Sequence, residues 1–366
     1  MISIITSLKN IGILSCAFLA IICFFTNAEI VNYTVITSIN FCYYTLIPTL
    51  FPYMIISSLL LRSALINKAL TGFFGKLFGI LGICKTTTSP ILIGNFCGFI
   101  NGPKSICESY GDKLTKFALN KAIILSSNAG FSFVVLLVGK KLWGSFSYGF
   151  ALYIFQIFIS FLINLQINRH DNFKSYELKK QDPFISFTYA VTSSAKTMIN
   201  ICAFTIFTSV LVNIISSILN LSSTSLFSVL LSSLFDITQG VSASLNLNNI
   251  HMCAFFTGFS VGFGGLSVAF QTFSVCSKFQ INNKKFIIMK FLQGIICGIF
   301  SLIYTSIFSI SPTLATSSLS SIHKKPLIIS YILVIFLVFI ITSVDFFENI
   351  IYNNIIKRKG ENHGRE

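Results

Sequence analysis

Apolar runs long enough to cross a bilayer recur along most of this chain, and they contain mainly Leu, Ile and Phe. A membrane-spanning helix needs about 20 predominantly apolar residues. The pattern predicts such segments at about residues 10–28, 35–62, 89–107, 117–139, 144–167, 186–219, 223–240, 250–275, 285–311 and 325–345. The sequence therefore predicts an all-α, polytopic helical membrane protein.

Two N-terminal segments allow more than one interpretation. The run at 10–28 ends in a Thr-Asn-Ala sequence, which is typical of a signal-peptide cleavage site or of the end of a first transmembrane helix. We interpret it as the helix. Residues 66–84 place Lys68 and Lys76 among Phe and Leu. We expect this amphipathic segment either to lie in the membrane interface or to enter the membrane as a hairpin.

The polar stretch Asn168–Pro183 separates two halves that look related. A shift of 164 residues places Gly94, Gly98, Phe99, Lys121, Ile123, Ile124 and Gly130 on Gly258, Gly262, Phe263, Lys285, Ile287, Ile288 and Gly294. Both copies contain a glycine-interrupted apolar segment, a short basic loop and a long helix. We divide the chain into an N-terminal transmembrane helix (1–34), a first repeat (35–167), a polar linker (168–185), a second repeat (186–311), a C-terminal transmembrane helix (312–348) and a basic tail (349–366).

Paired interrupted segments in two halves of a membrane protein indicate a transporter's binding site. The reason is that backbone which leaves the helix at membrane depth exposes N–H and C=O groups, and protein, water or ligand must satisfy them. The repeats are inverted if the segment at 223–240 crosses the membrane fully, and parallel if it enters and returns.

Composition and charge agree with a membrane protein. Charged residues make up 10% of the chain and apolar residues 54%, whereas a soluble domain has roughly 25% charged residues. The formal net charge is +15, but Lys and Arg lie mainly in short loops between the apolar runs. Such charges set topology and contact lipid headgroups, so we expect a lipid bilayer as partner and no nucleic acid. The basic tail indicates a cytoplasmic C-terminus.

The sequence offers no arrangement for catalysis or metal binding. The ten cysteines form no C-x-x-C motif and no Cys/His cluster, and most lie in apolar runs, where Cys acts as a small hydrophobe. No G-x-S-x-G, P-loop or H-E-x-x-H motif is present. We therefore expect no enzymatic activity, no metal and no cofactor.

The first glycine-interrupted segment ends in Asn101-Gly102-Pro103. Pro disfavours helix at the residue before it and suits a first helical turn, so a new helix is expected to begin near Pro103. Its N-terminus would carry a partial positive charge. Gly98 and Gly102 also belong to a four-residue glycine spacing that is typical of close helix packing.

Lys104 follows in that first turn, and Glu108 lies four residues further on. One interpretation is a mutual ion pair at this spacing. The other is an anion site, in which Lys104 and the helix N-terminus bind an anionic group while Glu108 holds Lys104 in place. Ionisable residues at membrane depth are costly and are candidates for function.

Further polar residues interrupt other apolar runs. Asn128 either joins helices through hydrogen bonds or belongs to the site. Asp236 either binds a coupling proton or sodium ion or caps the next helix. The second glycine-interrupted segment, GFSVGFGGLS, has no charge and offers backbone groups, Ser267 and, one turn later, Gln271.

Three elements resemble the YlbJ-type sporulation integral membrane proteins of the nucleoside-recognition, or gate-domain, superfamily. The stretch CGFINGPKSICESYGDKLTKFALNKAIILSSNAG resembles the family's CG[FY]PxGAK and LxxxEAxxLLxxxNN motifs, FDITQGV its [FL]E[IL]TxG element, and GFGGLSVAFQ its GxGGLSVxxQ element. The chain departs from these patterns at Ile100, Pro103, Ser127 and Asp236, and the EA pair is missing around Leu119.

The resemblance implies a site that contains Gly98, Gly102, Lys104, Asn128, Asp236, Gln239, Gly264, Gly265, Ser267 and Gln271, beside which Asn101 and Glu108 stand as candidates from the residues alone. It implies a permease for a small anion, dipicolinate, in a forespore membrane during endospore formation. The superfamily name suggests a nucleoside instead. A third hypothesis is a structural or assembly protein of the spore envelope. Expected protein partners are further copies of this chain or other sporulation membrane proteins.

Overall fold

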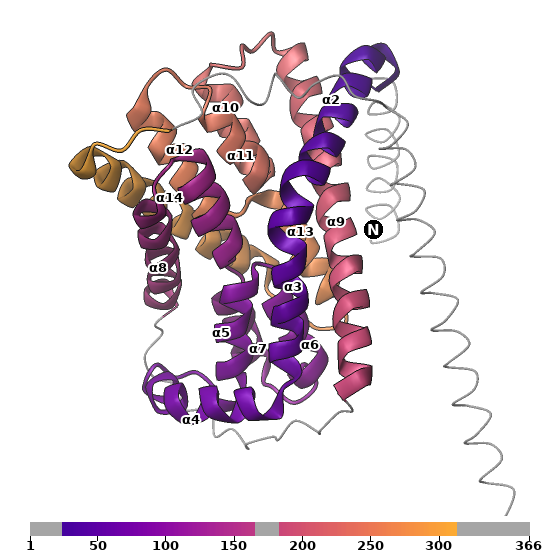
Figure 1. Cartoon of the computed structure of the whole chain (residues 1–366), viewed down its shortest axis with the longest axis vertical. Helices are drawn as coiled ribbons and strands as arrows, with labels where there is room; N and C mark the ends of the chain where they lie inside the picture. Colours follow the sequence, from indigo (N-terminus) through magenta and orange to yellow (C-terminus); the bar gives the residue numbers. More distant parts are fainter. Residues whose placement is uncertain (1–23, 165–182, 313–366) are drawn as a thin grey trace, which may run out of the picture.

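The computed structural model describes residues 24–164 and 183–312, and every regular element in these two ranges is a helix (Figure 1). The predicted helix at 10–28 lies largely outside the described residues, as do most of the polar linker, the span at 325–345 and the basic tail. The division of the chain into two repeats therefore stays a prediction.

The first half contains ten helical elements within the described residues. They are α2 (Ala28–Phe41), the π-helix η1 (Cys42–Leu46), α3 (Ile47–Arg62), α4 (Ala64–Ile80), the short 3₁₀ helix η2 (Lys85–Thr87), α5 (Thr88–Cys97), α6 (Asn101–Tyr110), α7 (Lys116–Ser126), the π-helix η3 (Ser132–Leu142) and α8 (Phe146–Ile163). The second half contributes α9 (Pro183–Ile218), α10 (Leu226–Phe235), α11 (Ile237–Ser244), α12 (Ile250–Phe263), α13 (Gly265–Val275) and α14 (Asn283–Phe308).

Five stretches of the described chain are long and apolar enough to cross a membrane: Ala28–Leu60, Phe146–Ile163, Phe187–Ile218, Ile250–Val275 and Asn283–Phe308. Large apolar side chains remain exposed on them, among them Phe158, Phe207 and Ile303. Lipid is the solvent in which such exposure is favourable. The prediction of an all-α fold is confirmed for the described residues, and its five candidate spans are compatible with an integral membrane protein.

The amphipathic segment predicted at 66–84 forms one uninterrupted helix, α4, which lies across one end of the molecule (Figure 1). It is therefore not a hairpin. Lys68, Phe73 and Lys76 are exposed on it, whereas Phe78 is buried. This arrangement of charge and apolar surface is typical of a helix that lies in a membrane interface.

Two pairs of contacts give the relative directions of helices around the centre. Glu108 contacts Tyr189 and Lys104 contacts Ser193, so α6 and α9 run antiparallel. The main-chain N–H of Asn282 donates to Asn120 Oδ1, and Lys290 Nζ donates to Asn128 Oδ1. Both of these pairs advance by eight residues in the same direction, so the α7 segment and the start of α14 run parallel.

Glycines allow α12 and α14 to approach closely. A Cβ atom on Gly258 would lie 2.4 Å from the carbonyl oxygen of Cys297, and one on Gly262 would lie 2.9 Å from Gln293 O. Small residues four apart permit such approach between membrane helices. Gly258 and Gly262 therefore lie in a helix interior as packing residues, and α12 ends at Phe263, with Gly264 directly after it.

Candidate functional site

Four of the short interruptions between consecutive helices in the described chain bear on the candidate site. They are Gly98–Ile100 between α5 and α6, Ser127–Phe131 between α7 and η3, Asp236 between α10 and α11, and Gly264 between α12 and α13. Gly98 has φ +106°, and Gly264 and Gly265 have φ +81° and +83°, which L side chains rarely adopt. Asp236 is extended, at φ −150° and ψ 140°.

The four interruptions touch one another. A Cβ atom on Gly130 would lie 2.9 Å from the Gly98 nitrogen. One on Gly264 would lie 2.8 Å from the Phe99 ring, and one on Gly265 would lie 2.8 Å from Asp236 Cα. The non-helical backbone is thus gathered in one place, where its polar groups lie close together.

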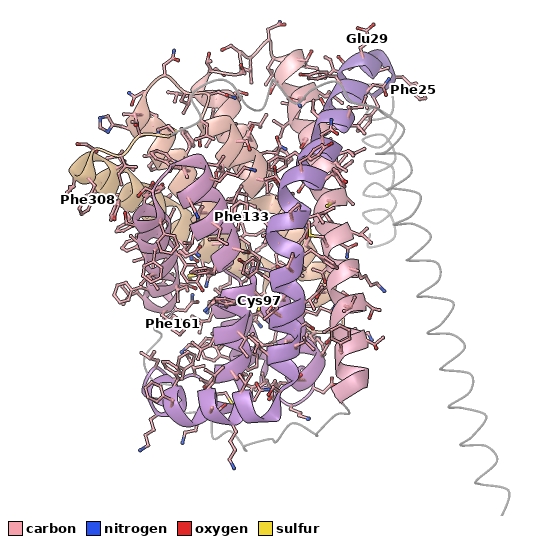
Figure 2. The ribbon with its side chains drawn as sticks, viewed as in Figure 1. Phe25, Glu29, Cys97, Phe133, Phe161 and Phe308 are labelled. Atoms are coloured by element: carbon pink, nitrogen blue, oxygen red, sulfur yellow. The ribbon has the colours of Figure 1, made fainter. Side chains whose placement is uncertain are left out.

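A first cavity of about 70 Å³ lies at this meeting point. All four interruptions or the helix turns beside them line it, and the opposite wall comes from α3 and α9. Cys97 and Phe133, which both line it, lie in the middle of the helical body in Figure 2. The candidate residues among its lining are Gly98, Asn101, Asp236 and Gln271.

Asp236 performs the capping role that the sequence offered as one of two alternatives. Its Oδ2 accepts hydrogen bonds from the Thr238 N–H at 3.0 Å, from the Gln239 N–H at 3.3 Å and from the Thr238 hydroxyl. An acidic side chain at this position satisfies free N–H groups of the first helical turn. Asp236 is buried and also lines the first cavity, so capping does not remove it from the site. Gln239 contributes its main-chain N–H.

Gln271 has one polar atom without a protein partner. Its Nε2 donates to Ser267 Oγ at 3.0 Å, whereas its buried Oε1 accepts no hydrogen bond. Unsatisfied buried acceptors are uncommon in folded proteins. Because Gln271 lines both cavities described here, its free acceptor is available to a ligand or to water.

A second cavity of about 220 Å³ adjoins the first, since Ile100, Thr197 and Gln271 line both. It lies among α6, α9 and α13. Three of its lining residues are ionisable, namely Lys104, Glu108 and Lys196, and Asn200 and Ser274 add polar groups.

Lys104 and Glu108 both reach across to α9. Lys104 Nζ donates to Ser193 Oγ at 2.5 Å. The Tyr189 hydroxyl donates to the Glu108 carboxylate, with distances of 3.1 Å and 3.2 Å to its two oxygens. The helix that carries them, α6, begins at Asn101, close to the predicted start.

Asn128 lies outside both cavities, in a polar cluster formed by Asn95, Asn128, Gln156, Lys290 and Gln293. Its Oδ1 accepts from Lys290 Nζ at 2.8 Å and from Gln293 Nε2 at 2.8 Å. Its Nδ2 donates to Asn95 Oδ1 at 2.8 Å and to Leu125 O at 3.1 Å. Asn128 thus joins α5 and α14 through hydrogen bonds.

The glycines of the candidate set have distinct positions. Gly102 packs in the helix body, because a Cβ there would lie 2.6 Å from Ser126 Cβ and 3.0 Å from Gly94 Cα. Gly264 and Gly265 form the turn between α12 and α13. Ser267, which is buried, holds Gln271 in place.

Sequence reasoning missed Lys196 and Lys290. Both lie inside long apolar runs, where an ionisable side chain is a candidate for function. That signal was present, but neither lysine belongs to a motif or to an interrupted segment.

Comparison with protein-family models, with curated proteins and with solved structures finds no match. The resemblance carried by the three sequence elements therefore stays a prediction. Among the residues that the structure describes, no group of three or more His, Cys, Asp or Glu side chains lies close enough to hold a metal ion.

Proposed function

We propose that this chain is a membrane permease for a small anionic metabolite. The observation that carries the proposal is the second cavity, where Lys104 from α6 and Lys196 from α9 line one space beside the first turn of α6. Two lysines against one glutamate leave the cavity positive. The partial positive charge of a helix N-terminus adds to this field and favours a bound anion.

The first cavity supports an aromatic substrate. Phe99 and Phe133 line it together with aliphatic side chains, and Asn101 and Gln271 add polar contacts. At about 70 Å³ it holds only a few water molecules. Substrate would bind in the second cavity and pass the first when the interruptions rearrange. By the sequence resemblance the substrate is dipicolinate, an aromatic dicarboxylate that is moved across a forespore membrane during endospore formation.

Basic residues indicate which end of the molecule faces the cytoplasm. Eight lysines lie on α4, in η2, in the loops before α7 and α14, or in the first turns of those two helices: Lys68, Lys76, Lys85, Lys113, Lys116, Lys278, Lys284 and Lys285. Hydrogen bonds join these segments: Lys116 Nζ contacts Gln280 Oε1, and Lys121 Nζ contacts Leu81 O. By the positive-inside rule this end is cytoplasmic. The second cavity lies on this side of the interruptions, so substrate would enter from the cytoplasm.

The parallel course of α7 and α14 supports parallel repeats. If Lys121 and Lys285 are equivalent, as the 164-residue shift suggests, inverted repeats would make their helices run in opposite directions. The contacts Asn120–Asn282 and Asn128–Lys290 run the same way along both segments. On this proposal the gate is the contact between the interruptions of the two halves.

A nucleoside is the second candidate substrate, and Gln271 favours it. Its free Oε1 suits the N–H and O–H groups of a base or ribose. Gln271 lines the first cavity together with Asn101 and two Phe rings, and no cationic side chain lines that space.

The deciding experiment is uptake of labelled dipicolinate into vesicles that contain the purified protein. We expect saturable uptake. Lys104→Ala and Lys104→Gln should abolish it, because each variant removes the positive charge in the first turn of α6. Lys196→Gln should raise KM about tenfold, as expected for loss of about 1.4 kcal/mol of binding. Lys68→Gln, which removes an exposed charge on α4, is the matched control and should leave uptake unchanged.

Labelled nucleoside is the parallel substrate. Nucleoside uptake that survives Lys104→Ala, with no dipicolinate uptake, would contradict the anion proposal and establish the second candidate. Absence of both fluxes would favour the structural or assembly role.

A further inference from the structure

Lys290 is a buried lysine that the proposed substrate path does not use. It lies in the apolar helix α14, and only 1% of its surface is exposed. Neither cavity includes it in its lining. An ionisable side chain at such depth is costly to keep and calls for a functional explanation.

The hydrogen bonds of Lys290 fit an uncharged amine. Its Nζ donates to Asn128 Oδ1 at 2.8 Å and to Gln293 Oε1 at 3.0 Å. A neutral amine has two N–H groups and one lone pair, whereas an ammonium group has three N–H groups. Glu and Asp are absent from α14 and from α7, α8, α12 and α13, which pack against it. A charge on Lys290 would therefore have no carboxylate on these helices to balance it.

The same cluster contains one acceptor that nothing uses. Gln156 is completely buried, and its Oε1 has no hydrogen-bond partner. Its Nε2 donates to Ala129 O at 2.7 Å, and its main-chain carbonyl accepts from Gln293 Nε2 at 2.9 Å. The cluster therefore contains a free acceptor for a third N–H on Lys290 once the side chains shift into contact.

The cluster also holds the interruption between α7 and η3. Asn128 belongs to that interruption and contacts Lys290, and the next residue, Ala129, accepts from Gln156. Ala129 and Gly130 line the first cavity. The hydrogen bonds around Lys290 are therefore linked through Asn128 and Ala129 to one wall of that cavity.

We propose that Lys290 is a proton-binding site that couples proton movement to opening of the first cavity. The amine lone pair takes a proton that originates from a hydronium ion in bulk water, which becomes water, and gives an ammonium group with three N–H groups. The new N–H turns to Gln156 Oε1 and pulls on the Ala129 contact. Loss of the proton to water restores the closed cluster. Coupling to substrate flux rests on the proposed permease function, whereas proton binding itself does not.

Other titratable groups lie on the helices that pack around Lys290 or directly after them. Among them are Cys297 on α14, Tyr148 and Tyr153 on α8, Cys253 and His251 on α12, Lys121 on α7 and Cys276 directly after α13. His251 contacts Ser306 near the far end of α14. Thiols and phenols are ordinarily neutral near pH 7. His251 is exposed. The His251→Gln variant therefore distinguishes its contribution to any pH dependence from that of Lys290.

Trp143 offers a readout that needs no substrate, and it is connected to the cluster through α14, on which Lys290 lies. It is the one tryptophan of the chain and follows directly after η3. Its ring lies 5.0 Å from Tyr148, whose hydroxyl shares a 2.6 Å hydrogen bond with Ser301 of α14. We expect its fluorescence in detergent-purified protein to change in one transition as pH varies, and the transition to be retained in His251→Gln and absent in Lys290→Met.

Asn128→Asp tests the same site in a protein that keeps Lys290. A carboxylate in contact with the amine favours the charged form, and we expect the transition to move to higher pH by about 1 to 3 units. An unchanged transition in both Lys290→Met and Asn128→Asp would overturn the proposal, and so would a wild-type protein without any transition. If Lys290→Met does not fold, the Asn128→Asp shift alone decides. Vesicle uptake with and without a pH gradient then tests coupling separately, so failure of transport leaves the fluorescence result intact.

Discussion

At the scale of single residues, some glycines are required for a turn with positive φ, whereas others lie in helices that would accept another residue. Gly265 has φ +83°, and a Cβ there would lie 2.8 Å from the nitrogen and Cα of Asp236. Gly72 lies in the middle of α4, and a Cβ there would meet nothing within 4 Å. The two sites form a matched pair for testing whether the meeting of the interruptions is required.

Gly265→Ala should destabilise the protein, because a non-Gly residue at positive φ costs about 1–3 kcal/mol before the contact with Asp236 is counted. Gly72→Ala should be neutral or stabilise by up to about 1 kcal/mol, since Ala favours a helix interior over Gly. The measurement is the unfolding temperature of both variants in detergent. Equal unfolding temperatures would mean that the Gly265–Asp236 contact does not hold the fold together.

Sequence reasoning at this scale singled out polar residues at the ends of apolar runs but not their partners. Asp236 could be recognised as a cap or an ion ligand from its place at the end of an apolar run. Its burial beside Gly265 could not, because that contact joins segments about 30 residues apart whose distance depends on tertiary packing. For the same reason the sequence marked Asn128 as a polar residue within an apolar run, but it did not indicate that Lys290 and Gln293 are its partners.

At the scale of elements, α6 and α13 each follow an interruption and lie against each other. Cys107 on α6 and Cys276 on α13 are both buried, and their sulfur atoms lie 2.9 Å apart. The two helices that begin at Asn101 and Gly265 are therefore in direct contact one or two turns beyond the cavity.

Mild oxidation with copper phenanthroline should join Cys107 and Cys276 in a disulfide, since only a small shift brings the sulfur atoms to the bond distance of about 2.05 Å. Copper phenanthroline accepts the two electrons, and the thiols release two protons. Peptide mapping by mass spectrometry should find the cross-linked pair in the wild type and in Cys97→Ser, but not in Cys107→Ser. Failure of the pair to form in folded protein would show that α6 and α13 are further apart than described here.

The apolar pattern predicted the helices well and their interruptions unevenly. Asn101-Gly102-Pro103 predicted the start of α6, because the conformational limits of Pro and Gly are local. The 164-residue shift matched Gly98 with Gly262, yet α12 continues to Phe263 and turns at Gly264. The glycines at 258 and 262 lie inside the helix because close packing against α14 requires small residues there, and glycine serves packing and turning alike.

At the scale of the whole molecule, charge separates the two ends. Most described lysines lie at the α4 end, whereas Lys140 and Lys141 lie in the last turn of η3, toward the other end. Glu29 lies at that other end in Figure 2. This distribution follows from the sequence alone once the helix directions are known, but the directions themselves come from the fold.

Topology can be tested with epitope tags in intact cells. A tag inserted at Asp112, between α6 and α7, should be reached by antibody only after permeabilisation. A tag inserted at Ser222, between α9 and α10, should be reached from outside, because that loop lies at the end away from α4. The reverse pattern would contradict the orientation and would place the second cavity on the outer side.

The length of α9 has a consequence for the membrane in which the protein works. Its apolar part, Phe187–Ile218, has 32 residues and at about 1.5 Å per residue measures about 48 Å, whereas the hydrocarbon core of a bilayer is about 30 Å thick. Such a helix has to tilt or thicken the lipid around it. Because α9 carries Thr197 and Lys196 in the cavity walls, a change in its tilt with bilayer thickness would change the width of the proposed substrate path. A membrane of altered lipid composition would then change the spacing of the cavity walls through the tilt of α9, without any ligand.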